Sequence, residues 1–312
     1  MTDPDTALDI ALVGGCHRDV IARTAAPFEP GTSCPGRVME TAGGVARNVA
    51  VLAASAGLRI GLVSRTGQDE AGRALVRALD ARGIDTGAVV ADPGAATGCY
   101  VAVHGDDGEL VAAVSDLSVY DRITPSALEP AWPTIARAGL VFADANLPTE
   151  TLTVLAERAG GRLCVDAISR AKAGRVLAAL RAGALGFVNL PSAEAIAGRA
   201  LAGAEEAASA LRDLGVLRAV VTSGARPVAV LTERSIEIAP VPAVAVVDVT
   251  GAGDALIAGA LTALSAGASL RAAVEVGILA SGAALGSSGA LDKLPPSVLQ
   301  AARSAARTGA SP

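Results

Sequence analysis

The stretch Val247-Asp248-Val249-Thr250-Gly251-Ala252-Gly253-Asp254-Ala255 places two glycines and a carboxylate at a single turn of the chain. Residues 243–247 before it are small or β-branched, and the segment Ala255–Leu264 after it is uncharged and compatible with a helix. We therefore predict a turn that opens a helix at these glycines. The first N–H groups of a helix lack internal partners and its dipole is positive there, so Gly251, Ala252 and Gly253 are predicted to hold an anion such as phosphate.

The carboxylate of Asp254 is predicted to lie on the first turn of that helix, beside the bound anion. A carboxylate does not bind phosphate well, but it can take a proton from a hydroxyl group that attacks the phosphorus, as phosphoryl transfer requires. The alternative interpretation is structural, with Asp254 as a helix cap and the glycines as a tight turn. Short glycine motifs are weak signals, and this one alone does not decide between the two.

Length and composition limit the remaining possibilities. A chain of 312 residues, 51% of them hydrophobic, can bury a large core, which predicts one large α/β domain over residues 1–312. The net charge of -5 makes nucleic acid an unexpected partner. An acidic N-terminus and the lack of any stretch of about 18 strongly apolar residues predict a cytoplasmic protein without a membrane span. Four scattered cysteines are predicted to be buried free thiols: Cys16, Cys34, Cys99 and Cys164.

Short β-branched runs alternate with alanine-rich helical segments along most of the chain. The strand-like runs are Ile10–Val13, Ile60–Val63, Leu140–Phe142, Leu163–Val165, Gly186–Val188 and Ala219–Val221. The helical segments that follow such runs include Ala46–Ala56, Glu70–Ala81 and Ala173–Arg181. This alternation predicts a mostly parallel sheet with helices on both faces, in which ligands bind at the carboxyl ends of the strands.

Two segments break the alternation, at about residues 20–40 and 96–118. The first carries three prolines between Ile21 and Met39, and the second has the pattern of a β-hairpin between Thr97 and Val114. Together they predict a small β-sheet that covers the active site as a lid and keeps water from the reaction. A surface hairpin without function is the alternative. Exposed strand edges in a lid favour pairing between two subunits, so we predict a homodimer.

Polar residues near the predicted strand ends are candidates for substrate contacts. Asp19 follows the first strand, and Gly43-Gly44 opens a helix that carries Asn48 on its first turn. A carboxylate and a carboxamide at the same edge of a sheet can bind the vicinal hydroxyls of a ribose. Three further polar residues end later strands in the same way: Asp144, Asn146 and Asp166. Each of these residues, taken alone, is also explained as a cap or turn residue.

Several other chemistries are disfavoured by what the sequence lacks. It contains no GxxxxGK[ST] loop and no HExxH, and its only histidines are His17 and His104, which excludes a histidine-rich metal site. A dinucleotide-binding oxidoreductase is disfavoured because Leu256 stands where the third glycine of that motif belongs.

The stretch Asp248 to Asp254 resembles the DTxGAGD signature of the ribokinase-like, PfkB-type sugar and nucleoside kinases, and Gly43-Gly44 with Asn48 resembles their N-terminal substrate motif. The resemblance extends from the region of Asp19 to Gly289-Ala290. It implies a three-layer α/β/α fold with a mostly parallel central sheet and a small β-sheet lid. Within the family, four segments resemble the pseudouridine kinases: residues 43–48, 113–118, 143–146 and 165–172.

The resemblance implies transfer of a phosphoryl group from ATP to the 5′-hydroxyl of pseudouridine, with Asp254 as the base and Gly251–Gly253 as the anion hole. It places substrate contacts at Asp19, Gly43, Gly44, Asn48, Asp116 and Asn146. It places nucleotide contacts at Lys172, Asn189, Glu194, Thr222 and Gly224. Glu194 is expected to bind Mg²⁺ through water, and Asp248 to lie beside a monovalent cation such as K⁺.

The sequence departs from the family pattern at two positions. The family's NxxE motif has an asparagine three residues before Glu194, where this chain has Pro191; Lys172 or Asn189 is then expected to compensate. Val249 replaces a threonine of the signature, a milder change because the backbone forms the cradle. Two alternative functions stay open: another nucleoside or sugar kinase, acting on ribose, uridine or adenosine, and a nucleoside-binding regulator without turnover.

Overall fold

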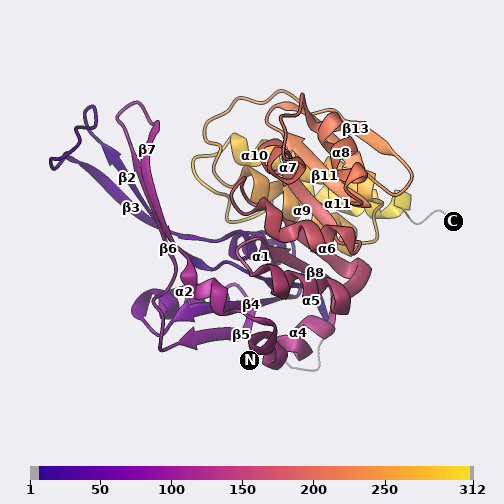
Figure 1. Cartoon of the computed structure of the whole chain (residues 1–312), viewed down its shortest axis with the longest axis horizontal. Helices are drawn as coiled ribbons and strands as arrows, with labels where there is room; N and C mark the ends of the chain where they lie inside the picture. The colour runs from indigo at the N-terminus through magenta and orange to yellow at the C-terminus, as the bar shows by residue number, and fades with distance from the viewer. Residues whose placement is uncertain (1–6, 310–312) are drawn as a thin grey trace.

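The computed structural model describes residues 7–309, and its largest element is a nine-stranded sheet (Figure 1). Its strands are β1 (Leu8–Val13), β4 (Ile60–Gly67), β5 (Asp85–Asp92), β8 (Ala138–Asp144), β9 (Leu163–Asp166), β10 (Leu185–Asn189), β11 (Arg218–Ser223), β12 (Arg226–Leu231) and β13 (Ile236–Ala239). Their order across the sheet is β13-β12-β11-β10-β9-β8-β1-β4-β5. All neighbours run parallel except for the pairs β11–β12 and β12–β13, so the predicted mostly parallel sheet is confirmed.

Helices cover both faces of this sheet, which gives the predicted three layers. One face carries α1 (Val45–Ser55), α2 (Glu70–Asp80), α9 (Ala252–Ser265), α10 (Leu270–Leu285) and α11 (Pro296–Gly309). The other carries α3 (Pro125–Leu128), α4 (Trp132–Ala136), α5 (Thr149–Ala159), α6 (Leu177–Arg181), α7 (Leu190–Ala197) and α8 (Ala204–Asp213). Four short 3₁₀ turns complete the layers: η1 (Ser118–Arg122), η2 (Glu129–Ala131), η3 (Gly160–Arg162) and η4 (Ala173–Val176).

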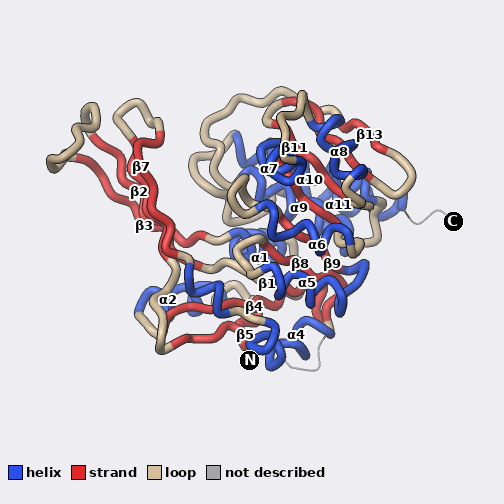
Figure 2. Tube along the Cα trace, viewed as in Figure 1, coloured by secondary structure: helices blue, strands red, loops and turns tan. Residues whose placement is uncertain are grey.

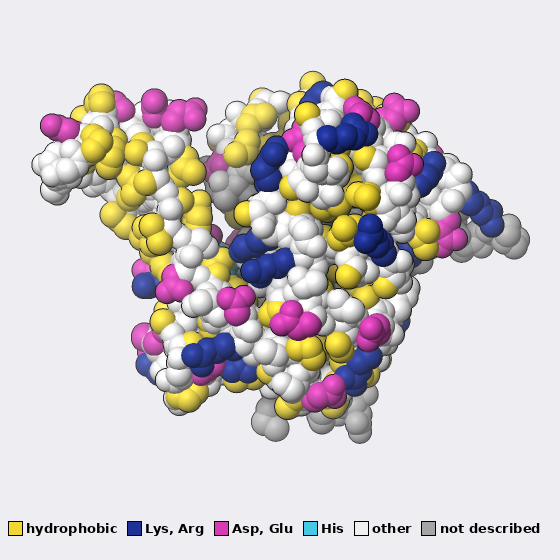
Figure 3. All heavy atoms as spheres, viewed as in Figure 1, with side chains coloured by type: hydrophobic (Ala, Val, Ile, Leu, Met, Phe, Trp, Pro, Cys, Tyr) yellow, Lys and Arg dark blue, Asp and Glu magenta, His cyan; other side chains and the backbone are white. Residues whose placement is uncertain are grey.

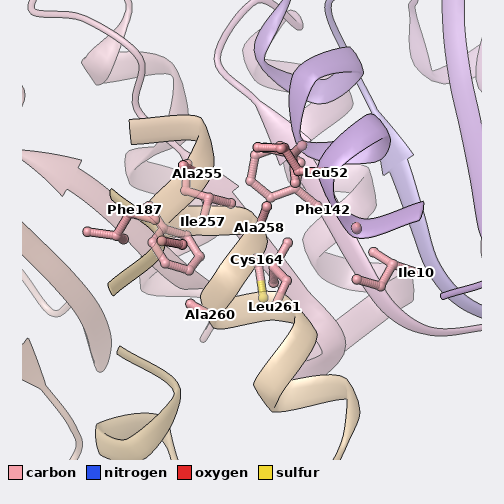
Figure 4. Close-up of a cluster of buried hydrophobic side chains, with 14 of the residues drawn as sticks. Ile10, Leu52, Phe142, Cys164, Phe187, Ala255, Ile257, Ala258, Ala260 and Leu261 are labelled. Atoms are coloured by element: carbon pink, nitrogen blue, oxygen red, sulfur yellow. The ribbon is translucent and has the colours of Figure 1, made fainter. Parts of the chain in front are cut away.

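Helix α9 lies against the middle of the sheet, which explains why its sequence lacks charge after the first turn. Its side chains, among them Ile257 and Leu261, face Phe142 of β8 and Phe187 of β10 in the core (Figure 4). Burying each leucine-sized side chain there contributes about 1.5–3 kcal/mol. Gly259 lets α10 pack close, because a Cβ atom on it would lie 2.9 Å from Ala280 Cβ. The small residues of α9 and α10 thus set the position of the helix whose N-terminus carries the glycine turn.

A second sheet of four strands projects from the body as an arm (Figure 2). Its strands are β2 (His17–Thr24), β3 (Gly36–Gly43), β6 (Cys99–His104) and β7 (Leu110–Asp116), in the order β3-β2-β6-β7. The two segments that break the sequence alternation therefore do form one small sheet, as predicted. Figure 3 shows open space between the outer part of this arm and the body. Asp19 lies within β2 of the arm and not in a turn after β1, because the chain enters the arm only three residues beyond Val13.

Some features differ from the sequence predictions. Cys16 and Cys164 are buried free thiols, but Cys34 and Cys99 are only partly buried because both belong to the thin arm, which has no second layer to cover them. The sequence pattern did not predict three edge strands of the large sheet, namely β12 and β13 at one edge and β5 at the other. No helix within residues 7–309 is long and apolar enough to cross a membrane.

Candidate active site

The order of the strands places a crevice beside β1, because the chain adds β4 and β5 on one side of it and β8 to β13 on the other. Ligands of open α/β sheets bind at such a switch point, beyond the carboxyl ends of the strands. Asp144 ends β8 there and is fully buried. Its Oδ2 accepts hydrogen bonds from Gly15 N at 2.8 Å and Ala46 N at 3.0 Å, and so joins the loop after β1 to the N-terminus of α1. The sequence placed Asp144 at a strand end, and the structure shows it as the anchor of the site.

The glycine pair before α1 allows two close backbone approaches. Gly44 has φ of 101°, and a Cβ on it would lie 2.3 Å from Gly15 O. A Cβ on Gly43 would lie 2.3 Å from Asp19 Oδ2. Both glycines are therefore needed for Asp19 of the arm to reach the N-terminus of α1, where Asn48 projects from the first turn. The structure thus brings together the predicted Asp19, Gly43, Gly44 and Asn48.

The glycine turn opens α9 as the sequence predicts. Gly251 caps the helix with φ of 74°, a conformation that favours glycine, and a Cβ there would lie 2.8 Å from Ala290 Cβ. Around Gly253 the space is open, since a Cβ on it would meet no atom within 4 Å. The first turn of α9 therefore presents its N–H groups to accessible space. An anion of the size of a phosphoryl group fits this cradle.

Asp248 fixes the loop that precedes the cradle. Its Oδ1 accepts a hydrogen bond from Thr250 N at 2.8 Å, and its Oδ2 accepts one from Gly289 N at 3.0 Å. Hydrogen bonds from Thr250 lower the pKa of this carboxyl, and the backbone of Gly289 adds to the effect. Asp248 is thus an ionised carboxylate that joins two loops.

Asp254 and Asn48 meet across the helices α9 and α1. Asn48 Nδ2 donates a hydrogen bond to Asp254 Oδ2 at 2.8 Å. Burial, together with the charges of Asp144 and Asp19, raises the pKa of Asp254 to about 7, although the Asn48 hydrogen bond and the charge of Arg47 lower it. A carboxylate with a pKa near neutrality can act as a general base at physiological pH.

Asp166 at the end of β9 belongs to the same acidic region. Burial raises its pKa to about 8, and the charges of Asp254 and Asp144 contribute to this shift. Within the described residues, no three acidic, histidine or cysteine side chains are arranged to hold a metal ion directly.

A second hydrogen-bonded group holds Asp19 at the base of the arm. His17 Nε2 lies 3.3 Å from Asp19 Oδ1, and His17 Nδ1 lies 3.0 Å from Tyr120 Oη. The Tyr120 hydroxyl also accepts a hydrogen bond from Cys16 N at 2.8 Å, so it joins the loop after β1 to His17. Nothing in the spacing of these residues predicts this contact, because Tyr120 is more than a hundred positions away.

Two of the residues expected on the nucleotide side lie on neighbouring strands. Asn189 at the end of β10 pairs in register with Thr222 of β11, and Gly224 follows with φ of 60° in the next turn. Glu194 lies on α7, where its carboxylate contacts Arg170 at 2.6 Å. Pro191 occupies the first turn of α7, where no amide hydrogen is needed.

The two residues expected to compensate for Pro191 are held differently. Asn189 Oδ1 accepts a hydrogen bond from Ser192 N at 2.9 Å and its Nδ2 donates to Ile168 O at 3.2 Å, so its amide serves as the cap of α7. Lys172 Nζ donates to Asn146 Oδ1 at 2.5 Å, and burial lowers the pKa of this amine. The lysine is therefore the residue with a charge to offer a phosphate.

Asp116 stands apart from the other candidates. It is exposed at the end of β7, and its Oδ1 accepts a hydrogen bond from Ser118 Oγ at 3.0 Å. The register places it opposite Cys99, at the base of the arm. Arg47, in contrast, was not singled out from the sequence although it lies within the site; the available signal was that it is the one charged residue of α1.

An exposed apolar strip runs beside the cradle. It consists of Val244, Val246, Val247 and Val249 from the segment before α9, together with Leu279 of α10. The backbone of Val247 is fixed by a hydrogen bond from its N–H to Leu285 O at 2.7 Å. Exposed apolar groups of this kind next to an anion cradle suit a ligand with a planar base and a phosphate tail.

Comparisons with known proteins agree with this geometry. Residues 7–296 match the model of the pfkB family carbohydrate kinases. The pseudouridine kinase of Escherichia coli is 30% identical over 256 residues, covering 80% of this chain and 82% of that protein. A carbohydrate kinase from Agrobacterium tumefaciens superposes with a TM-score of 0.81 at 32% identity, covering 95% of this chain and 97% of that one. The Arabidopsis thaliana ribokinase complexed with ribose and ATP shares the fold, with a TM-score of 0.80 at 22% identity over 96% and 99% of the two chains. With the glycine turn at α9, the diglycine at α1 and these matches, the chain belongs to the PfkB family of carbohydrate kinases.

Proposed function

We propose that this chain transfers the γ-phosphoryl group of ATP to the 5′-hydroxyl of pseudouridine, giving pseudouridine 5′-phosphate and ADP. The observation that carries the proposal of phosphoryl transfer is the Asp254 carboxylate, which is hydrogen-bonded to Asn48 at the open N-terminus of α9. The choice of pseudouridine is supported by the 30% identity to the E. coli enzyme over most of both chains.

Asp254 is the base in this proposal. It accepts the proton of the 5′-hydroxyl while the 5′-oxygen forms its bond to the γ-phosphorus and the bond between that phosphorus and the ADP oxygen breaks. Its pKa of about 7 leaves it largely ionised at pH 8 and still basic enough to hold the proton. The N–H groups of residues 251–253 stabilise the charge on the transferred group.

Asp19, Gly43, Gly44, Asn48 and Asn146 bind the ribose in this proposal. Asp19 Oδ1 is buried and forms no hydrogen bond within the described structure apart from its contact with His17 Nε2 at 3.3 Å, so it can still accept one from a ligand. A ribose hydroxyl supplies such a donor. Asn48 presents its amide to Asp254 and to the same space.

The nucleotide lies on the other side of the cradle in this proposal. Thr222, Gly224, Asn189 and Lys172 line that side, and the apolar strip beside α9 takes the adenine. Glu194 would hold the Mg²⁺ of the nucleotide through a water molecule, and the ion would supply positive charge that offsets the charge of the phosphates. Asp248 would lie beside a monovalent cation such as K⁺; omitting monovalent cations from the assay tests this.

We also propose that the arm pairs with the arm of a second copy. Its strands and hairpin carry apolar side chains that are more than half exposed in this chain: Val38, Met39, Leu110 and Val114. Figure 3 shows hydrophobic side chains along the arm. Light scattering tests the proposal, with Val38→Glu and Val114→Lys expected to give a monomer; a wild-type monomer at micromolar concentration would contradict it.

A panel of acceptors tests the proposed reaction. Purified enzyme with ATP and Mg²⁺ is offered pseudouridine, uridine, adenosine and ribose, and ADP release is followed with Asp254→Asn as the inactive control. The expected result is the highest kcat/KM with pseudouridine. A higher kcat/KM with another acceptor would show that the enzyme is a kinase with a different substrate. Pseudouridine binding without ADP release from any acceptor would indicate a regulator and would contradict the proposed kinase activity.

A further inference from the structure

Arg47 is an unusual residue for its position. It lies on α1 between residues that pack into the core, and its guanidinium is largely withdrawn from solvent. Its Nε is buried and has no hydrogen-bond partner, and within residues 7–309 it forms no ion pair with a carboxylate. A buried guanidinium without an ion pair destabilises a fold, so its presence calls for another explanation.

The contacts of Arg47 provide one. Its Nη1 donates to Asn48 Oδ1 at 2.9 Å, and more weakly to Ala42 O at 3.4 Å. A guanidinium can only donate hydrogen bonds, so the atom of Asn48 that faces it must be the carbonyl oxygen. The Nδ2 group of Asn48 is then forced to face Asp254, to which it donates. Without Arg47, the contact with Asp254 alone would hold the amide in this orientation.

Charge adds to this geometry. The charged groups that act on Asp254 are Asp144 from β8, Asp19 from β2, Asp166 from β9 and Arg47 from α1. The charges of Asp144 and Asp19 raise the pKa of Asp254, and Arg47 is the cation that lowers it; the charge of Asp254 in turn raises the pKa of Asp166. Burial lowers the pKa of Arg47 itself, but a guanidinium stays protonated at neutral pH.

We propose that Arg47 is a positioning residue for phosphoryl transfer, which holds the Asn48 amide in the one orientation that donates to Asp254 and thereby fixes the base toward the acceptor hydroxyl. The inference rests on the proposed function, since it assigns Arg47 a part in the reaction that Asp254 performs. It goes beyond the motif residues themselves, because Arg47 acts through Asn48 and needs no contact with the substrate.

Two variants separate the geometric part from the charge. Arg47→Met removes both the donor and the charge, and Arg47→Lys keeps the charge while losing the planar fork that can serve Asn48 and Ala42 together. We expect Arg47→Met to lower kcat by roughly 10- to 100-fold, the loss typical of a misplaced catalytic group, with a smaller rise in KM for the acceptor because Asn48 also faces the ribose. The acid limb of its pH profile should move to higher pH. Arg47→Lys should lower kcat less and keep the limb near that of the wild type.

Arg303→Met is the matched control, because Arg303 is exposed on α11 away from the site and should leave kcat unchanged. Thermal unfolding of each variant shows whether it is folded. An unchanged kcat in Arg47→Met, or a rise in KM at constant kcat, would overturn the inference; the latter would make Arg47 a binding residue.

A titration that needs no turnover separates the test of the role of Arg47 from the test of the proposed function. Carboxyl ¹³C resonances are titrated in wild type and variants, with Asp254 identified by its loss in Asp254→Asn. The titration of Asp254 should move to higher pH in Arg47→Met and stay in place in Arg47→Lys. No movement in Arg47→Met would overturn the inference, whether or not any acceptor is phosphorylated, whereas a wild type that phosphorylates nothing would overturn the proposed function.

Discussion

Replacing Asp254 with asparagine should stabilise the fold at alkaline pH while it abolishes turnover. In the folded chain the pKa of this carboxyl is about 7, against the ordinary value of 3.8, because burial and neighbouring carboxylates disfavour its charge. Between about pH 4 and pH 7 the folded protein therefore binds a proton that the unfolded chain has released, and above pH 7 the folded state carries the full cost of the buried charge. At about 1.4 kcal/mol per pH unit, the difference of about three units corresponds to up to about 4 kcal/mol.

Asparagine is nearly isosteric and uncharged, and its Oδ1 can accept the hydrogen bond from Asn48. The gain in the free energy of unfolding should thus be largest at pH 8.5, about half as large at pH 5.5, and absent below pH 4, where both side chains are neutral. This dependence of the stability gain on pH is expected when a buried charge is removed. A substitution that improved packing would give the same gain at every pH.

The assay is urea unfolding of wild type and Asp254→Asn at pH 8.5, 7 and 5.5 without nucleotide. Asp116→Asn is the control, because Asp116 is exposed at the end of β7 and its replacement should change stability by less than about 0.5 kcal/mol. A variant that is no more stable than wild type at pH 8.5, or a gain that does not shrink as the pH falls, would refute the reasoning.

Four further predictions follow from the same site. The kcat/KM of wild type should fall about tenfold per pH unit below pH 7, as Asp254 takes up its proton; a profile flat from pH 8 to 5 would assign the base elsewhere. Gly251→Ala should weaken ATP binding and slow turnover, because position 251 has positive φ and lacks room for a Cβ. Gly253→Ala should fold normally, because the space around position 253 is open. If the two variants had equal effects on ATP binding in calorimetry and on turnover, the assignment of the turn as an anion cradle would be contradicted. Asn48→Ala should lower kcat by roughly 10- to 100-fold and raise the pKa of Asp254, since a hydrogen bond that lowers this pKa is lost; an unchanged pH profile would count against it. Tyr120→Phe should cost about 1–3 kcal/mol in denaturant, because a buried N–H loses its acceptor, and a loss below 0.5 kcal/mol would show that this hydrogen bond contributes little.

The helix at the glycine turn was predictable because its determinants are local. Gly251 must adopt positive φ, and the residues from Ala255 onward are apolar on all sides because α9 is buried against the sheet and α10. The parallel sheet followed for a similar reason, since each buried strand is a short apolar run. The antiparallel edge strands β12 and β13 were missed, because an edge is defined by what lies beside a strand and not by its own residues.

The arm also combines a local feature that the sequence predicts with a long-range pairing that it does not predict. Its hairpin between β6 and β7 has a local turn pattern and was predicted, whereas the parallel pairing of β2 with β6 joins residues about eighty positions apart. That pairing puts His17 and Asp19 at the base of the arm, and only then can His17 reach Tyr120.

The sequence by itself determined the fold class, the cradle at Gly251–Gly253 and the short set of polar residues near the strand ends, because these depend on backbone conformation and on periodicity over a few residues. Tertiary structure alone decided that Asn48 of α1 meets Asp254 of α9, 206 positions away, and that Arg47 turns the Asn48 amide toward it. It also decided the pKa of Asp254. Burial and the charges of Asp144 and Asp19 set that value, and these come from strands whose proximity exists only after the chain has folded.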